Sequence, residues 1–132
     1  MLRAVSESAG VASHLVPKVA TGFGGGISRR GDICGALTGG IIALGIAFGR
    51  DRERQGDADF TYEKSRQLID EFKEKFGEFD CFKLTGCDFL APGGYEEFQR
   101  KGIKEELCVN LVRFATCRTA ELMREKPPER KG

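Results

Sequence analysis

Cysteine is the residue type in this chain best suited to chemistry, because five cysteines but only one histidine occur among its 132 residues. Thiolates attack disulfides, and they also bind zinc or the iron atoms of a cluster. The spacings do not match the C-x-x-C pairs of zinc ribbons or thioredoxin-like sites. No C-x-x-C-H motif is present, so c-type haem is excluded. The cysteines therefore point to thiol or metal chemistry without separating the two.

Position relative to helix starts distinguishes the first three cysteines. Cys34 comes two residues after Asp32, a good N-cap, so its sulfur is expected in the first turn of a helix. Free N–H groups and the helix dipole favour the thiolate there, which predicts a reactive thiol with a lowered pKa. Cys81 follows a second candidate cap, Asp80, and Cys87 falls in or near a turn.

The other two cysteines lie on a long helix predicted near the end of the chain. At 100° per residue, Cys108 shares the face that must be buried, whereas Cys117 lies on the opposite side and is expected to be an exposed bystander. A free cysteine is often simply a small buried apolar residue, and this alternative accounts well for Cys108. Four cysteines remain as candidates for joint redox action or for metal ligation, namely Cys34, Cys81, Cys87 and Cys108.

Other kinds of site have little support in the sequence. His14 is the only histidine and lies near a predicted helix end, so Cys–His or Ser–His–Asp catalysis is not indicated. The glycine-rich run at 22–31 lacks the Gly-Lys-Ser/Thr ending of a P-loop, and it does not match GxGxxG after a strand. Asp32, which follows it, would repel phosphate. We therefore expect a structural role for these glycines.

The sequence predicts that the elements that position the cysteines form an all-α fold. This fold is a small helical bundle of about four to six helices around a glycine-rich apolar central helix. This central helix spans residues 33–48, has no charged residue, and is bounded by Asp32 and Gly49. About 16 residues rising 1.5 Å each reach only about 24 Å, which is short of a 30 Å hydrocarbon core. Burial inside the protein is therefore expected, and a membrane span is not.

Periodicity and turn residues place the remaining elements. Helical stripes are predicted at 2–15 (before Pro17), 60–76 (before Gly77) and 103–124, with one or two helical turns within 80–88. Loops are predicted at 21–31, 50–59 and 92–94, and residues 126–132 are expected to form a flexible tail. No alternating strand pattern and no internal repeat is present. Residues 1–132 are therefore interpreted as a single helical domain.

Composition narrows the environment and the partners. Lys and Arg number 21 against 20 for Asp and Glu, a net charge of +1, and 40% of residues are hydrophobic, as in a soluble globular domain. Without a clustered basic face, no nucleic acid partner is expected. The first residues lack the apolar run of a secretory signal, so a cytoplasmic location is expected, where thiols are usually reduced, metal-bound or catalytic.

A set of motifs gives a more specific indication. The string Gly22-Phe23-Gly24-Gly25-Gly26 is followed by Cys34-Gly35-Ala36-Leu37-Thr38-Gly39, and further downstream come Phe76-Gly77, Cys81, Leu84, Gly86-Cys87-Asp88 and Cys108 with Val112. Together these strings resemble the redox-active C_GCAxxG_C_C family over roughly residues 20–120. The resemblance implies a prokaryotic, mainly helical protein with cysteine-based redox or metal chemistry. A related domain accompanies the split-Soret type of cytochrome.

One departure from the family pattern concerns the partner of Cys34. That pattern begins with a cysteine upstream of CGAxxG, whereas no cysteine precedes Cys34 in this sequence. The chain either starts late or has lost that residue. Pairing of Cys34 with an upstream thiol is therefore not supported here, and Cys87 is one substitute partner.

Three functions follow from these observations. In the first, a dithiol/disulfide redox protein or electron-transfer protein, Cys34 attacks a disulfide or oxidised substrate of an unidentified redox partner, and Cys81 or Cys87 resolves the mixed intermediate. In the second, Cys34, Cys81, Cys87 and Cys108 are ligands to zinc or an iron–sulfur cluster. In the third, which is not catalytic, the glycine-rich helix is an interaction surface for a homodimer or a membrane partner.

Overall fold

The computed structural model describes residues 1–11, 13–50 and 58–129. Within these ranges the chain forms seven α-helices and no β-strand, which confirms the predicted all-α class. Several helices are only one or two turns long, which is why there are more of them than the sequence predicts. Their bounds are α1 (Leu2–Ser8), α2 (Leu15–Ala20), α3 (Gly35–Phe48), α4 (Asp59–Phe76), α5 (Cys81–Thr85), α6 (Gly94–Arg100) and α7 (Val109–Met123).

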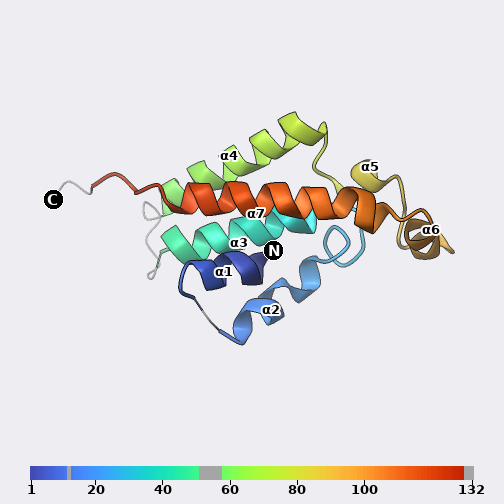
Figure 1. Ribbon diagram of the computed structural model, residues 1–132, viewed down its shortest axis with the longest axis horizontal. Helices are drawn as coiled ribbons and strands as arrows, with labels where there is room; N and C mark the ends of the chain where they lie inside the picture. Colours follow the sequence, from blue (N-terminus) through green and yellow to red (C-terminus); the bar gives the residue numbers. More distant parts are fainter. Residues whose placement is uncertain (12, 51–57, 130–132) are drawn as a thin grey trace.

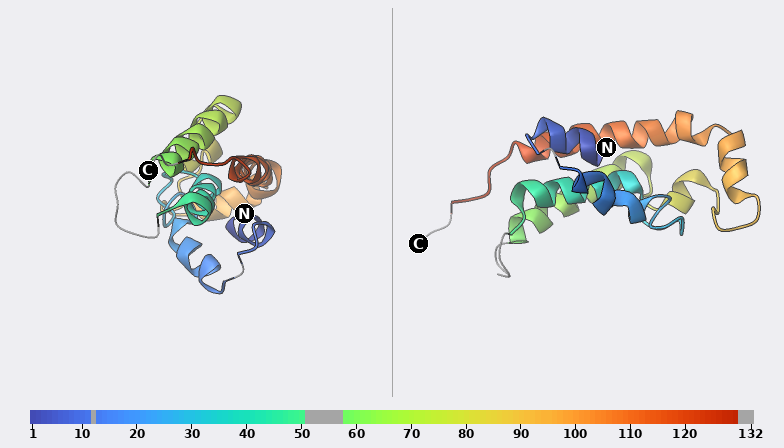
Figure 2. Two further views of the ribbon diagram at one scale, coloured as in Figure 1. Left: turned by 90° about the vertical axis from the view of Figure 1, so that its left-hand side faces the viewer. Right: turned by 90° about the horizontal axis from the view of Figure 1, so that it is seen from below.

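The three long helices α3, α4 and α7 pack against one another, and α1 and α2 lie along one side of this bundle (Figures 1 and 2). Helices α3 and α7 run in the same direction, and α4 runs in the opposite direction (Figure 1). The N-terminal ends of α3 and α7 therefore lie at the same end of the bundle. The short helices α5 and α6 occupy that end as well (Figure 1).

Helix α3 is the glycine-rich apolar centre that the sequence predicts. A Cβ atom added at Gly40 would lie 2.6 Å from Leu68 Cδ2 on α4 and 2.7 Å from Thr119 Oγ1 on α7. Glycine at this position therefore lets α3 approach both neighbouring helices closely. No helix in the described part of the chain is long and apolar enough to cross a membrane.

Apolar side chains from all three long helices fill the core. Burying each Leu or Phe side chain contributes about 1.5–3 kcal/mol. The largest members, each 0–2% exposed, are Leu37, Leu44, Leu68, Phe72, Leu111 and Leu122. At the edge of the core an ion pair joins α4 to α7, in which Arg118 Nη2 donates to Glu71 Oε1 at 3.0 Å. Arg118 lowers the pKa of Glu71, so this carboxylate stays charged at more acidic pH than an ordinary glutamate.

The N-terminal region differs from its prediction. The helix expected over 2–15 ends at Ser8, and Gly10 adopts a φ of +80° in the turn that follows. A second helix, α2, then begins at Leu15, with Pro17 in its first turn, where the missing N–H costs little.

Parts of three predictions lie outside the described residues. These parts are Ala12 in the predicted first helix, residues 51–57 of the polar connection, and residues 130–132 of the tail. The described residues of the tail, 126–129, have no regular structure and are exposed.

The region before α7 also differs from its prediction. The expected loop at 92–94 is followed directly by a helix, α6, which the sequence analysis missed. Gly93 has a φ of +75° at its start, and Gly94 lies so close to the Asp88 carbonyl that a Cβ there would overlap its oxygen. The helix predicted at 103–124 is present, but it opens with a π-helical turn, η3 (Lys104–Cys108), before α7.

Two glycines on α3 provide a matched test of the close packing. Gly40→Ala should lower the free energy of unfolding by about 1–3 kcal/mol, because its methyl group overlaps Leu68 and Thr119. Gly45→Ala should raise it by up to about 1 kcal/mol, because nothing lies within 4 Å of the added carbon and alanine is the better helix former. Urea unfolding measures both. Equal changes in the two variants would contradict the packing argument.

Candidate functional site

A short backbone pairing joins the residues just before α3 to those just before α5. The N–H of Cys34 donates to the Phe79 carbonyl at 2.8 Å, and the N–H of Cys81 donates to the Asp32 carbonyl at 2.7 Å. Between these bonds lies an isolated antiparallel bridge, too short to leave an alternating pattern in the sequence. Cys34 and Cys81 become diagonal neighbours across this pairing.

The start of α3 lies later than the sequence predicts. Cys34 itself occupies the N-cap position, and the helix begins at Gly35, so the prediction of Asp32 as the cap is wrong. The Asp32 carbonyl is instead engaged by the segment before α5. The Cys34 side chain makes no cap hydrogen bond of normal geometry, yet the backbone N–H groups of Ala36 and Leu37 are near enough to stabilise its thiolate. The expected helix-terminal environment of this thiol is therefore present.

The glycine-rich loop packs against the start of α5, in agreement with the structural role expected for it. A Cβ atom at Gly26, where φ is +73°, would lie 2.6 Å from the Cβ of Cys81. One at Gly31, where φ is +77°, would lie 2.7 Å from the Cβ of Phe82. Both positions need glycine for its backbone conformation and its small size.

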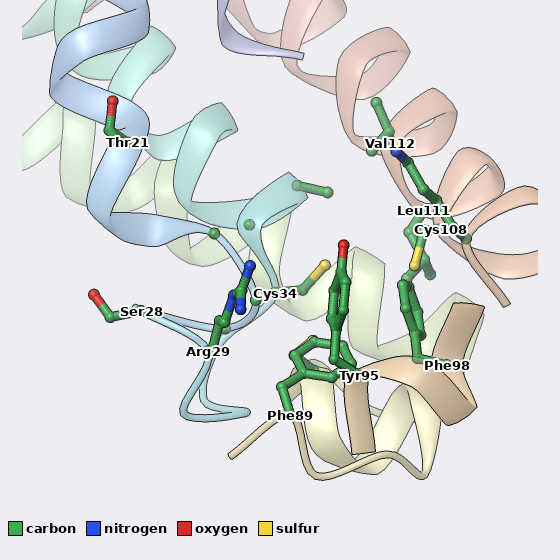
Figure 3. A pocket seen from close by; sticks show the side chains of 17 residues that line it. Thr21, Ser28, Arg29, Cys34, Phe89, Tyr95, Phe98, Cys108, Leu111 and Val112 are labelled. Atoms are coloured by element: carbon green, nitrogen blue, oxygen red, sulfur yellow. The ribbon is translucent and has the colours of Figure 1, made fainter. Parts of the chain in front are cut away.

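A pocket of about 670 Å³ opens where the cysteine segments meet (Figure 3). Its walls include Cys34 at the start of α3, Cys81 at the start of α5 and Cys108 at the start of α7. Figure 3 shows the sulfur atoms of Cys34 and Cys108 projecting from two sides of the cavity. Cys87 is buried, with 3% of its surface exposed, and does not line the pocket. Cys117 is exposed and lies outside the pocket.

The pKa of Cys81 is affected by the charges of the other three candidate thiols. Burial, followed by the negative charges that Cys34, Cys108 and Cys87 would carry as thiolates, raises the pKa of Cys81 to about 12. Burial also raises the pKa of Cys108, with a further increase from Cys34. Two thiolates cannot easily be present in this cluster at the same time.

The pKa of Cys34 is raised as well, so the prediction of a lowered value is wrong. Burial is the largest cause, since only 9% of the residue is exposed. The N–H groups of Ala36 and Leu37 act in the opposite direction and offset part of the effect. The helix terminus is therefore present, but desolvation outweighs it.

Sequence reasoning missed one wall of the pocket. Phe89, Tyr95 and Phe98 form an aromatic cluster with ring centroids 4.9–6.0 Å apart. The guanidinium of Arg29 lies 4.8 Å from the centroid of the Tyr95 ring, and Lys104 is a second basic residue in the lining. The i, i+3 spacing of Tyr95 and Phe98 could have signalled a helix here.

The cysteine cluster is not pre-arranged for a metal ion. Among the described residues, no group of three or more His, Cys, Asp or Glu side chains is placed to hold one. Four-thiolate ligation therefore stays a prediction, and it requires the sulfur atoms to turn toward one another. His14, at the N-cap of α2, is exposed and does not line the cysteine pocket.

One known protein family matches most of this chain. The family model described as "Putative redox-active protein (C_GCAxxG_C_C)" matches residues 1–122 of the chain. The chain belongs to the C_GCAxxG_C_C family. This confirms the resemblance seen in the sequence and supports a general redox role. No curated protein and no solved structure matches the chain significantly. In this member of the C_GCAxxG_C_C family, the CGAxxG string forms the start of α3 and one wall of the pocket.

The raised pKa values predict an unusual pH dependence of alkylation. In reduced protein carrying Cys117→Ser, Cys34 and Cys81 should be protonated at neutral pH and react slowly with iodoacetamide. Their rates should keep rising with pH beyond about 8.5, the pKa near which the rate of an ordinary cysteine levels off, and the rate of Cys34 should level off before that of Cys81. Peptide mass spectrometry across the alkaline range measures each site. A rate for Cys34 that has already levelled off at neutral pH would contradict the burial argument.

Proposed function

We propose that the protein is a dithiol/disulfide redox protein whose active pair is Cys34 and Cys81. The observation that carries this proposal is the backbone pairing before α3 and α5, which makes the two residues neighbours on the wall of one pocket. The family description supports the redox role, and the pocket gives a substrate access to both thiols.

Cys34 is the attacking residue in this proposal. Its thiolate, stabilised by the Ala36 and Leu37 N–H groups, attacks one sulfur of a substrate disulfide. The substrate S–S bond breaks, a first substrate thiol leaves with a proton, and a mixed disulfide remains on Cys34. Cys81 then loses its proton and attacks the Cys34 sulfur, which releases the second substrate thiol. The substrate gains two electrons and two protons, and the protein ends with a Cys34–Cys81 disulfide.

The electrostatic coupling gives these two steps an order. The Cys34 thiolate is the largest charge effect that raises the pKa of Cys81. When Cys34 enters a mixed disulfide, it can no longer carry a negative charge, so this contribution to the raised pKa of Cys81 is lost, while burial, the largest cause, remains. Cys81 is therefore a better nucleophile after the first step than beside a Cys34 thiolate.

Cys81 is a better resolving residue than Cys87, the other partner that the sequence suggested. Cys87 is almost fully buried and does not line the pocket, whereas Cys81 does. Cys108 also lines the pocket, and its thiol is coupled to Cys34. It is therefore a third thiol available to the same intermediate.

Single cysteine variants test the proposed pair. Cys34→Ser should slow the reaction of reduced protein with a small disulfide by about tenfold or more, equivalent to about 1.4 kcal/mol or more of barrier, because the attacking thiol is gone. Cys81→Ser should prolong the lifetime of the mixed disulfide on Cys34, and adding Cys108→Ser should make it accumulate, because both other thiols in the pocket lining are then gone. Stopped-flow thiol release and intact-protein mass spectrometry measure these effects. Both variants are made in a Cys117→Ser background, because the exposed Cys117 thiol would also react with the disulfide. An unchanged rate when Cys34→Ser is added to that background would remove the proposal.

A second candidate function is a metal or iron–sulfur module. It is favoured by the mutual repulsion around Cys81, which a bound cation would relieve, and by the preference of zinc and iron clusters for thiolates. Cys34, Cys81, Cys87 and Cys108 would be its ligands. An iron–sulfur cluster would supply one-electron transfer, whereas zinc would supply structural support.

The metal and sulfide content of the anaerobically purified protein distinguishes the two functions. The metal module would be favoured by stoichiometric iron with sulfide, or by stoichiometric zinc, if the metal is lost in both Cys87→Ser and Cys108→Ser. These two variants are informative because exchange between Cys34 and Cys81 does not require either residue. Metal-free protein that folds fully and loses thiols reversibly in pairs would favour the dithiol function. Metal analysis, the visible absorption spectrum and thiol titration provide the readouts.

A further inference from the structure

The side chains that line the cysteine pocket carry positive charge and no carboxylate, although the chain contains 20 acidic residues. Arg29 and Lys104 both line it. Among the described residues, no carboxylate forms an ion pair with either of them. Two basic side chains therefore stand beside the thiols without a negative partner.

The acidic residues that lie close to Cys34 and Cys81 in sequence line a different pocket. Asp32 and Asp80 precede Cys34 and Cys81 closely in sequence, but they line a separate pocket. Arg30 lies 3.7 Å from Asp32, and Lys83 lies 3.7 Å from Asp80. Glu105 is close enough to raise the pKa of Cys108, yet it does not line the cysteine pocket either. The positive charge in the pocket is therefore not cancelled by a carboxylate in its lining.

The position of Arg29 is fixed by its backbone and by an aromatic ring. Ile27, Ser28 and Arg29 all adopt positive φ values, of 62°, 51° and 66°, which non-glycine residues rarely do. The turn is held by the Arg29 N–H, which donates to the Gly24 carbonyl at 2.9 Å, and by bonds from Ser28. The guanidinium then stacks over Tyr95. Figure 3 shows Arg29 beside Tyr95 on the same side of the cavity as Cys34.

The remaining wall is suited to an apolar or aromatic group. Phe89, Tyr95 and Phe98 present ring surfaces to the cavity (Figure 3). The volume of about 670 Å³ lies within the range of about 300–1,000 Å³ typical of small-molecule sites. A pocket with cations, an aromatic wall and thiols combines the contacts that a small anionic disulfide would need.

We propose that this pocket binds a small disulfide that carries carboxylate groups. Its carboxylates pair with Arg29 and Lys104, its apolar body packs on the aromatic wall, and its S–S bond lies against Cys34. This inference rests on the proposed dithiol function and adds the substrate class. The reaction is the exchange described above, in which the bound disulfide is reduced to two thiols and Cys34 and Cys81 are oxidised.

Disulfide probes of different charge test the substrate class. The anionic aromatic probe is 5,5′-dithiobis(2-nitrobenzoate), the neutral aromatic probe is 4,4′-dithiodipyridine, and the cationic probe is cystamine. Each rate with reduced Cys117→Ser protein is divided by the rate of the same probe with 2-mercaptoethanol. This ratio should be at least about tenfold higher for the anionic probe than for the neutral one, and lowest for cystamine. Added salt should reduce the advantage of the anionic probe.

Variants that remove positive charges identify the residues responsible. Arg29→Gln combined with Lys104→Gln should lower the rate with the anionic probe by about tenfold and leave the rate with the neutral probe unchanged. The matched control is Arg30→Gln, because Arg30 is the next residue but faces Asp32 in the other pocket. It should change neither rate. A loss with both probes would mean that the substitutions act on the thiols, and it would overturn the inference.

The possible failures are distinguishable. If Cys34 reacts with all probes but the charge of the probe makes no difference, the substrate class is wrong and the dithiol function stands. Preferential reduction of a protein disulfide, with no advantage for the anionic probe, would have the same meaning. If adding Cys34→Ser to the Cys117→Ser protein leaves the rate with every probe unchanged, the dithiol function itself fails.

Discussion

The arrangement of the site depends on a few backbone hydrogen bonds between the residues before α3 and those before α5. Besides the bonds made by Cys34 and Cys81, the Phe82 N–H donates to the Gly31 carbonyl at 3.0 Å. Each such bond contributes only about 0.5–1.5 kcal/mol net. Together they nevertheless set the relative position of the two thiols, and they hold the glycine-rich loop against α5. The close contact at Gly26 is a requirement of the same pairing.

Packing at this end of the bundle also determines the acidity of the thiols. The parallel course of α3 and α7 brings Cys34 and Cys108 to one pocket, and burial there raises the pKa of both. The resting state is therefore a protonated cluster rather than a stored thiolate. Under the proposed function, Cys34 must lose its proton before it attacks, and once it is in a mixed disulfide its charge no longer adds to the effect of burial on the pKa of Cys81.

The long helices could be predicted from the sequence because their apolar stripes are strictly local patterns. The exposed position of Cys117 and the apolar course of α3 follow from the same periodicity. Helix α6 was missed because its glycine-rich start looks like a loop until the contact with Asp88 is known. The bridge before α5 and the raised pKa of Cys34 could not be predicted, since both arise from contacts between distant segments. Arg29 was missed for the same reason, because its contact with Tyr95 joins two such segments.

The same pairing has a consequence for synthesis and folding of the chain. Cys34 and Cys81 are separated in sequence by the whole of α3 and α4, and they become neighbours only when those helices have packed together. Before that point, the cysteines are independent thiols with the acidity of any unfolded peptide, and each can be oxidised separately. Completion of the fold buries Cys34 and brings it beside Cys81, and under the proposed function this makes the two residues a single two-electron unit.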